Sequence, residues 1–268
     1  MDKFYQQVLE FAIEITAEVG PQLMLDFGQV QADQKADGSL VTKADQWSDL
    51  TIRNAIAATF PDHGVLTEET KHTFDGEEWC WIIDPLDGTT NFTRGIPIWG
   101  ISLGLLHHGI PVFGCVHLPP INQTFHGFYT EDTKGAFLNN RPIQTSKEQP
   151  TKNHFFSLCA RSIEVLKKPF PCKIRMLGVA TYNFLCVGAG ITLGGVEATP
   201  KIWDLAAVWV ILKAAGAQWI YLDKKEIFPL QTGVNYGNIS MPTLVVSQEN
   251  LVPLFYPLVE FLGQNKTD

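Results

Sequence analysis

Two carboxylates stand three positions apart directly after a short apolar run. Residues 79–83 have the length and bounds of a buried strand, and they lead straight into Asp84 and Asp87. Pro85 lacks an N–H group and fixes φ, so the chain should leave the strand there. Residues 88–90 read as a turn that opens a helix, whose free N–H groups suit a phosphate oxygen. If both carboxylates point into one cleft mouth, hard cations with oxygen ligands fit them better than zinc does.

The same two carboxylates also have a purely structural explanation, since Asp84 could end a strand and Asp87 could cap a helix. Other acids share this ambiguity. Glu68 lies in a pair of loop acids, which are usually just solvated. Asp204 could favour a helix dipole, and Asp45 stands at capping-box spacing before a helix. The residues alone leave both explanations open.

The composition describes an ordinary globular protein with room for a sizeable core. The chain has 268 residues, of which 45% are apolar and 18% charged. A net charge of -8 and a pI near 5.4 argue against nucleic acid or an anionic membrane as the main partner. An anionic substrate would therefore have to be bound through metal ions or a local basic spot.

The cysteines and the N-terminus indicate a cytoplasmic location. The five cysteines are odd in number and dispersed, and no C-x-x-C pair occurs, so reduced thiols are expected. Acidic residues at positions 2, 10, 14 and 18 exclude a signal peptide. No run approaches 18 uninterrupted apolar residues, so no membrane span is expected.

Hydrophobic periodicity predicts two long helices before the acidic strand and several strands after it. Apolar residues recur at helical spacing from Phe4 to Leu23, and a second helix should begin at Thr42. The polar segment 29–41 reads as an exposed loop. Short β-type runs at 99–106, 112–118 and 124–129 imply antiparallel strands.

The second half alternates predicted strands and helices. Strands are expected at 154–159, 173–177, 191–198, 218–222 and 243–246, and helices at 180–189, from 203 onward and at 250–262. A soft boundary near residue 145 divides the chain into halves 1–145 and 146–268, which should form one compact unit. This pattern predicts an α+β or layered α/β fold.

The motif DPLDGTTNF, with the apolar residues WCWII before it, closely resembles the central motif of the inositol monophosphatase family of magnesium-dependent, lithium-sensitive phosphatases. Glu68-Glu69 before it and Trp203-Asp204-Leu205-Ala206-Ala207 after it occur in the family's order and roughly its spacing, so the resemblance spans about residues 35–216. It implies a layered α-β-α-β-α sandwich. The haloacid dehalogenase type of phosphatase has a different aspartate spacing and usually an N-terminal motif.

The resemblance implies a site with two or three Mg²⁺ ions. One ion would take Glu68, Asp84 and the Leu86 carbonyl, a second would take Asp84, Asp87 and Asp204, and a weaker third would use Glu68 and waters. The substrate phosphate would bridge the metals, and a metal-activated water would attack it without a protein nucleophile.

The resemblance also assigns the remaining roles in catalysis and in phosphate binding. Thr89, backed by Asp45, matches the family's water-orienting pair, and Glu68 joins them as a catalytic residue. The backbone N–H groups of Gly88 and Thr89 would hold the phosphate. Two departures mark a divergent member: Lys35 comes at shortened spacing, and Ser39 replaces an Asp in the loop associated with the third metal.

The substrate pocket is less defined than the metal site. Glu197 matches the residue that accepts a hydroxyl of inositol, and Gly178 and Ala180 flank Val179 where a substrate-binding turn is expected. We expect myo-inositol 1-phosphate as substrate and a homodimer as the working form. The same resemblance covers histidinol-phosphate and other sugar or nucleotide phosphatases, and a catalytically silent sugar-phosphate binding protein is the alternative from another class.

Overall fold

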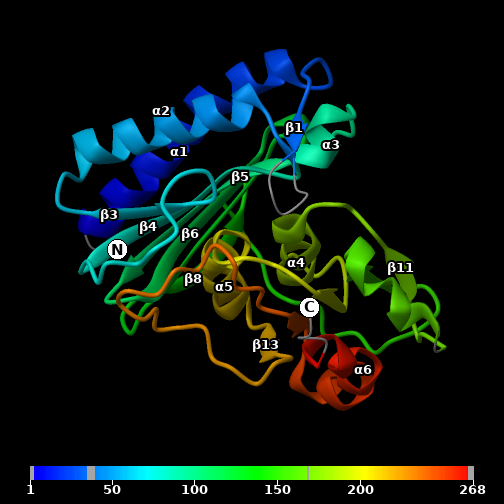
Figure 1. The fold of residues 1–268 in the computed structure, drawn as a ribbon. Helices are drawn as coiled ribbons and strands as arrows, with labels where there is room; N and C mark the ends of the chain where they lie inside the picture. Colours follow the sequence, from blue (N-terminus) through cyan, green and yellow to red (C-terminus); the bar gives the residue numbers. More distant parts are fainter. Residues whose placement is uncertain (1–2, 35–39, 168, 265–268) are drawn as a thin grey trace.

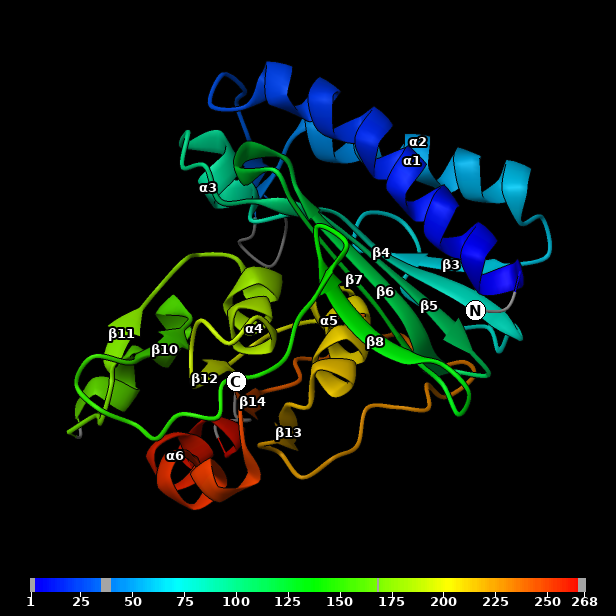
Figure 2. The same cartoon turned by 180° about the vertical axis from the view of Figure 1, so that it is seen from behind.

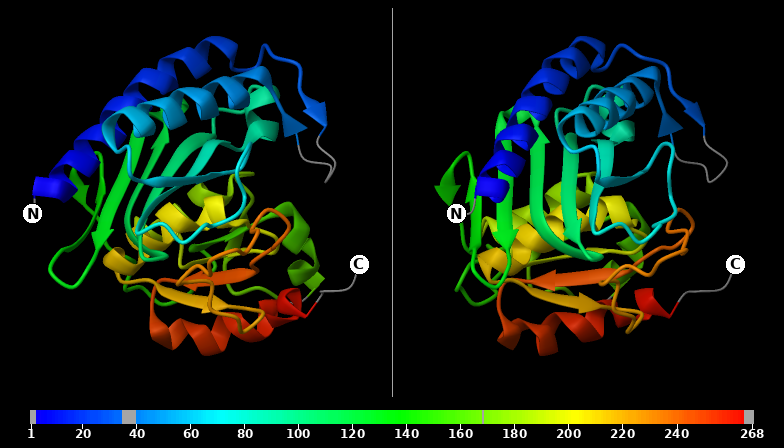
Figure 3. Two further views of the ribbon diagram at one scale, coloured as in Figure 1. Left: turned by 60° about the vertical axis from the view of Figure 1, so that its left-hand side comes forward. Right: turned by 90° about the vertical axis from the view of Figure 1, so that its left-hand side faces the viewer.

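The protein is built in five layers of helices and sheets. The computed structural model describes residues 3–34, 40–167 and 169–264. Helices α1 and α2 cover one face of a seven-stranded sheet, α4 and α5 lie between that sheet and a five-stranded sheet, and α6 covers the outer face of the second sheet (Figures 1 and 3). The predicted layered α-β-α-β-α sandwich is therefore confirmed.

The seven-stranded sheet has strand order β3-β4-β5-β6-β7-β8-β9. Only β3 and β4 pair in parallel, and every later pair is antiparallel, as the short strands and tight turns of the sequence predict. The strands are β3 (Gly64–Thr67), β4 (Trp79–Asp87), β5 (Gly100–His107), β6 (Ile110–Leu118), β7 (Gln123–Tyr129), β8 (Lys134–Leu138) and β9 (Arg141–Pro142).

The outer helix layer forms because α1 (Lys3–Asp26) and α2 (Lys43–Thr59) each present an apolar stripe to the sheet. Buried residues of α1 recur every three or four positions, from Val8 to Leu23, and pack with Trp81 and Phe113 of the sheet. Helix α2 begins after Thr42, whose side chain and Asp45 form the predicted capping box. Figure 2 shows both helices lying across the same face of the strands.

The inner helix layer is buried on both sides. Helix α5 (Ile202–Ala215) is apolar almost all round, and α4 (Ala180–Gly188) packs beside it. Two glycines of the large sheet let α5 come close: a Cβ at Gly114 would lie 2.2 Å from the Ala207 carbonyl oxygen, and one at Gly104 would lie 2.9 Å from the Ala207 nitrogen. A larger residue at either glycine would push α5 away from the sheet.

The five-stranded sheet has strand order β11-β10-β12-β14-β13, with parallel pairing on one side of β12 and antiparallel pairing on the other. Its strands are β10 (Phe155–Leu158), β11 (Lys173–Arg175), β12 (Gly194–Glu197), β13 (Gln218–Tyr221) and β14 (Thr243–Val246), and the outer helix is α6 (Val252–Val259).

Several boundaries differ from the sequence prediction. The final helix is shorter than 250–262, because 3-10 turns η3 (Glu249–Leu251) and η4 (Glu260–Gly263) flank α6. Part of the predicted loop 29–41 forms a small ladder between β1 (Asp33–Gln34) and β2 (Leu40–Val41). The division of the chain at residue 145 stays a prediction. None of the helices among the described residues is long and apolar enough to cross a membrane.

Candidate active site

A cleft of about 690 Å³ opens where the end of β4 faces the beginnings of α3 (Thr89–Thr93), α4 and α5. Both halves of the chain line it. All predicted metal and substrate residues line this cleft, and the remaining catalytic residue, Asp45, bonds to one of them. The predicted residues on its wall are Glu68, Asp84, Leu86, Asp87, Gly88, Thr89, Gly178, Ala180, Glu197 and Asp204.

An irregular stretch of β4 brings Asp84 and Asp87 to the same cleft. In a regular strand, residues three apart point to opposite faces. Here the pairing with β5 shifts register between these two residues, with Asp84 opposite Ser102 and Asp87 opposite Gly100. The prediction that the strand ends before Pro85 was wrong, because β4 continues through the bulge to Asp87.

Asp204 comes from the first turn of α5 and completes a cluster of three carboxylates. One oxygen each of Asp84, Asp87 and Asp204 lies within 4.8 Å of the others. Burial raises the pKa of Asp84 well above its usual value, and the neighbouring carboxylates, Glu68 first, raise it further. Burial and Asp87 likewise raise the pKa of Asp204.

This donor set fits a hard divalent cation. Two like charges about 4 Å apart repel by roughly 4 kcal/mol at an effective dielectric of 20, so the cluster costs free energy unless positive charge offsets it. All the donors are oxygens, which suits Mg²⁺, Mn²⁺ or Ca²⁺ and does not suit a thiolate-preferring ion.

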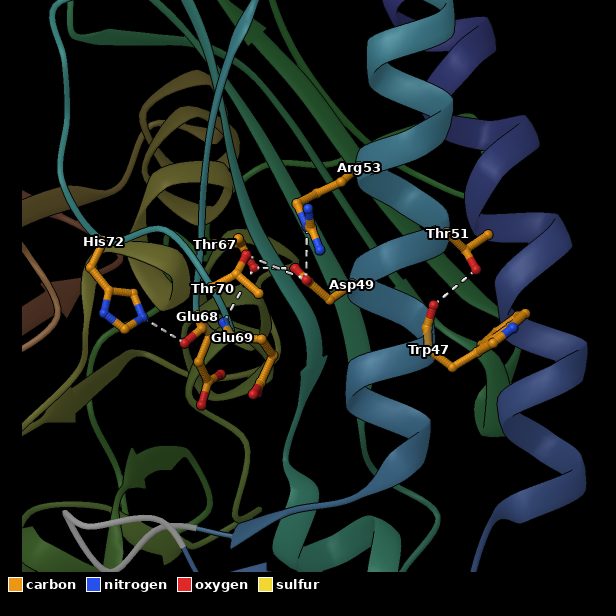
Figure 4. Close-up of polar contacts among 9 residues, drawn as sticks. All are labelled: Trp47, Asp49, Thr51, Arg53, Thr67, Glu68, Glu69, Thr70 and His72. Carbon is orange, nitrogen blue, oxygen red and sulfur yellow. Dashed lines mark hydrogen bonds and ion pairs between the residues drawn. The ribbon is translucent and has the colours of Figure 1, made fainter.

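Glu68 is positioned by a hydrogen-bond network that sequence reasoning missed. The buried Asp49 of α2 accepts a short hydrogen bond from the Thr67 hydroxyl and a 2.8 Å bond from Arg53 Nε (Figure 4). His72 Nε2 contacts the Glu68 carbonyl oxygen at 2.8 Å. The backbone on both sides of Glu68 is thus held while its side chain faces the cleft.

Asp45 serves the helix cap and the cleft at once. Its Oδ2 accepts a 2.7 Å hydrogen bond from the Thr42 backbone N–H, and its Oδ1 accepts a 3.0 Å bond from the Thr89 hydroxyl. The Thr89 hydroxyl also lies 3.2 Å from the Leu86 carbonyl oxygen. Capping and contact with Thr89 are therefore compatible explanations for Asp45, not alternatives.

Helix α4 holds Asp87 from the opposite wall. The Thr181 backbone N–H donates to Asp87 Oδ2 at 2.9 Å, its hydroxyl makes a short bond to the same oxygen, and the Ala180 N–H also donates to this carboxylate. Burial nevertheless raises the pKa of Asp87. The sequence signal for Thr181 was a hydroxyl residue in the first turn of a predicted helix.

Glu197 lines the cleft, close enough to Asp87 and Asp204 to interact with their charges, and is only 5% exposed. Asn183 Nδ2 donates a 2.7 Å hydrogen bond to Glu197 Oε1, and the Cys159 thiol also hydrogen-bonds to the carboxylate. Burial raises the pKa of Glu197 to about 7, against the lowering effect of these bonds. Sequence reasoning missed Asn183 and Cys159.

Asn91 links the central motif to the segment before α4 that contains Leu177 and Gly178. Its Nδ2 donates to the Leu177 carbonyl at 2.8 Å and to the Ile98 carbonyl at 2.9 Å. Gly178 has φ +78°, and a Cβ there would lie 2.8 Å from Asn91 Oδ1, while a Cβ at Gly88 would lie 2.6 Å from Val179 Cγ2. Glycine is needed at both positions because the two walls approach so closely.

Two cationic residues of the cleft were also missed. Arg161 is exposed and donates a 3.0 Å hydrogen bond from Nη1 to the Thr199 hydroxyl, and Lys201 lies on the same wall. They place two positive charges in the cleft of a protein whose net charge is -8. The departures at Lys35 and Ser39 lie outside the described residues.

Many known proteins are similar to this chain in sequence or in structure. A model described as the inositol monophosphatase family matches residues 5–260. A fructose-1,6-bisphosphatase/inositol-1-monophosphatase of Thermotoga maritima is 34% identical over 226 residues, which are 81% of this chain and 86% of that protein. A histidinol-phosphatase of Chlorobaculum parvum is 29% identical over 227 residues, 78% of this chain and 83% of that protein. The solved structure of a Thermotoga maritima IMPase has a TM-score of 0.80 at 30% identity and covers 95% of this chain and 99% of that one.

Proposed function

Because this chain belongs to the inositol monophosphatase family, we propose that it hydrolyses a small phosphate monoester with the help of Mg²⁺. The observation that carries the proposal is the convergence of Asp84, Asp87 and Asp204 in one cleft with Glu68 on its wall. Carboxylates from distant parts of the sequence meet there at a distance that favours a shared cation.

The chain's own oxygens would hold two or three ions. Asp84 is central, since its carboxylate interacts with Glu68, Asp87 and Asp204, and the Leu86 carbonyl would add a neutral oxygen. Thr181 occupies Oδ2 of Asp87, and we assign Oδ1 of this carboxylate to a cation. Asp204 supplies the last carboxylate. When bound, Mg²⁺ stabilises the charge that develops on the phosphate and makes water more acidic.

Thr89 and Asp45 orient the attacking water and receive its proton. A Thr hydroxyl has one hydrogen and two lone pairs. While Thr89 donates that hydrogen to Asp45 Oδ1, its lone pairs accept a hydrogen bond from water in the cleft. Gly88 and Thr89, which begin α3, direct backbone N–H groups at the phosphate.

The substrate we propose is myo-inositol 1-phosphate. Glu197 is a buried carboxylate that accepts from Asn183 and has lone pairs left for hydroxyl groups, and a ligand without hydroxyls would leave these lone pairs unsatisfied at a cost of about 1 to 3 kcal/mol. Gly178 and Ala180, on either side of Val179, shape the adjoining wall. The Thermotoga maritima relative carries this activity in its name.

A sugar bisphosphate is the second candidate, because Arg161 and Lys201 line the same cleft as Glu197. A guanidinium binds a second phosphate in a bidentate manner. The name of the same relative includes fructose-1,6-bisphosphatase. Histidinol phosphate stays a further alternative, since its ammonium group would pair with Glu197.

A phosphate-release assay tests the proposal. The untagged protein is incubated with myo-inositol 1-phosphate, fructose 1,6-bisphosphate or histidinol phosphate, with and without Mg²⁺. We expect Mg²⁺-dependent release, fastest from myo-inositol 1-phosphate. A folded protein that binds these esters and releases no phosphate from any of them would instead be a catalytically silent sugar-phosphate binding protein.

We also propose a cytoplasmic homodimer that lithium inhibits. The five free cysteines support a reducing compartment. Exposed apolar side chains at Ile163, Leu166 and Met176 support association of two copies. Light scattering coupled to size exclusion measures the mass, and a lithium titration of phosphate release measures inhibition.

A further inference from the structure

Outside the cleft, one glutamate and two histidines form a compact cluster at the opposite end of the large sheet. One ligand atom each from Glu78, His107 and His108 lies within 4.8 Å of the others. Glu78 directly precedes β4, whose far end carries Asp84 and Asp87, so the cluster lies on the order of 20 to 30 Å from the cleft along the strand. Figure 1 shows the start of β4 near the N-terminus, away from α3.

We propose that Glu78, His107 and His108 bind a divalent transition-metal ion of the Zn²⁺ or Ni²⁺ type. These ions bind well to imidazole nitrogens, and two histidines with one glutamate are a known zinc ligand set. This donor set differs from the all-oxygen carboxylates of the cleft, so the two sites should select different metals.

The separation of the donor atoms fits one shared ion. His107 Nε2 lies 3.5 Å from Glu78 Oε1. Two ligands at about 2.0 to 2.1 Å from a tetrahedral ion lie roughly 3.3 Å apart. The observed separation thus needs only a small side-chain adjustment to admit the ion.

The backbone fixes the three side chains next to one another. Residues 79 and 107 are cross-strand partners, and the His108 N–H donates a 2.7 Å hydrogen bond to the Glu78 carbonyl oxygen. His108 and Gly109 have φ +49° and +76° and form the two-residue turn that joins β5 to β6. A metal ion here would therefore bind a hairpin turn to the neighbouring strand.

The imidazole of His107 is held by stacking, and its surroundings carry negative charge. The Trp79 and His107 rings stack with their centroids 4.2 Å apart, which limits rotation of the imidazole. The carboxylates of Asp62 and Glu78 both lie close enough to act on the nearby His63, where they favour the protonated form, although burial lowers the pKa of His63 more.

The test uses Ni²⁺, which favours imidazole and quenches the fluorescence of a neighbouring tryptophan. Untagged full-length protein in excess Mg²⁺ is titrated with Ni²⁺, and binding is followed by calorimetry and by tryptophan emission. We expect one equivalent to bind with partial quenching, and about tenfold or greater weakening in His108→Asn and in Glu78→Gln. Asn tolerates the left-handed conformation at position 108, so the first variant should fold.

Two further variants make the result specific. His154→Asn removes the histidine of a comparable surface pair, in which His154 Nε2 lies 2.9 Å from Glu148 Oε2, and it should leave Ni²⁺ binding unchanged. Trp79→Phe keeps a ring against His107, so it should keep the affinity and lose the quenching. Equal Ni²⁺ affinity in wild type, His108→Asn and Glu78→Gln would overturn the proposal, as would quenching that persists in Trp79→Phe.

Discussion

The substitution Asp45→Asn separates helix capping from catalysis at a residue that does both. An asparagine oxygen can still accept from the Thr42 N–H, which Asp45 Oδ2 binds at 2.7 Å. The amide NH₂ then faces the Thr89 hydroxyl, which Asp45 Oδ1 binds at 3.0 Å. Thr89 must accept this hydrogen bond, so its own proton turns to the Leu86 carbonyl oxygen at 3.2 Å, no carboxylate is left to receive a proton, and one fewer lone pair is available to orient water.

The two effects differ in size by several kcal/mol. Loss of a positioned acid-base group typically lowers the rate by about 10²- to 10⁴-fold, which is roughly 2.7 to 5.4 kcal/mol in the barrier. The helix loses only a charge near its N-terminus, about 0.3 to 1 kcal/mol of stability. For a chain of this size that corresponds to a fall in Tm of only a few degrees, roughly 1 to 4 °C.

The matched control is Thr42→Ala at the other end of the same capping box. Thr42 Oγ1 accepts the Ala44 and Asp45 N–H groups at 3.1 and 3.3 Å, and its hydroxyl donates to Asp45 Oδ2, so its loss should cost about 1 kcal/mol. Because Thr89 binds the other oxygen, Asp45 Oδ1, kcat should fall far less in Thr42→Ala than in Asp45→Asn. Phosphate release and thermal unfolding are measured for both variants. Unchanged kcat in Asp45→Asn would refute the reasoning and leave Asp45 with the cap alone.

Three further predictions use the same two assays. Asp87→Asn should abolish Mg²⁺-dependent phosphate release without unfolding the protein; near-normal turnover at saturating Mg²⁺ would contradict the two-metal site. Because the pKa of Glu197 is raised to about 7, the ionised fraction of its carboxylate grows as the pH rises through that value. We therefore expect kcat/KM on myo-inositol 1-phosphate to rise over the same pH range. Glu197→Gln should remove this limb and lower kcat/KM only modestly; a wild-type preference for histidinol phosphate that collapses in Glu197→Gln would instead select the ammonium substrate. Asp49→Asn should weaken Mg²⁺ activation and lower the free energy of unfolding by about 1 to 3 kcal/mol, because the Arg53 and Thr67 donors lose a charged acceptor. A normal Mg²⁺ dependence of this variant would show that the network does not position Glu68.

The sequence predicted the order of elements well because periodicity and turn residues act locally. The helix from Phe4 and the capping box at Thr42 depend on residues within one or two turns, and both are confirmed. The strand end at Pro85 was wrong because proline argues only against regular pairing, and a bulge accommodates it.

The residues of the candidate site could be predicted only where they belong to a long motif that resembles a known family. Asp84, Asp87 and Asp204 each had a local explanation, and no local rule says that the start of α5 faces the end of β4. The hydrogen bonds from Thr181 to Asp87, from Thr67 to Asp49 and from Asn183 to Glu197 join positions 14 to 94 apart, so spacing could not reveal them.

Because α5 is buried between two sheets, its final position depends on parts of the chain that the ribosome makes late. Asp204 is delivered by a helix whose apolar surface needs both sheets, and the second sheet is complete only when β14 has been made. A nascent or truncated chain that stops before this point carries the whole central motif and Asp204 but lacks the complete second sheet that packs against α5. On the proposed function, such a fragment should neither bind Mg²⁺ in the cleft nor release phosphate from esters, so this activity requires β14.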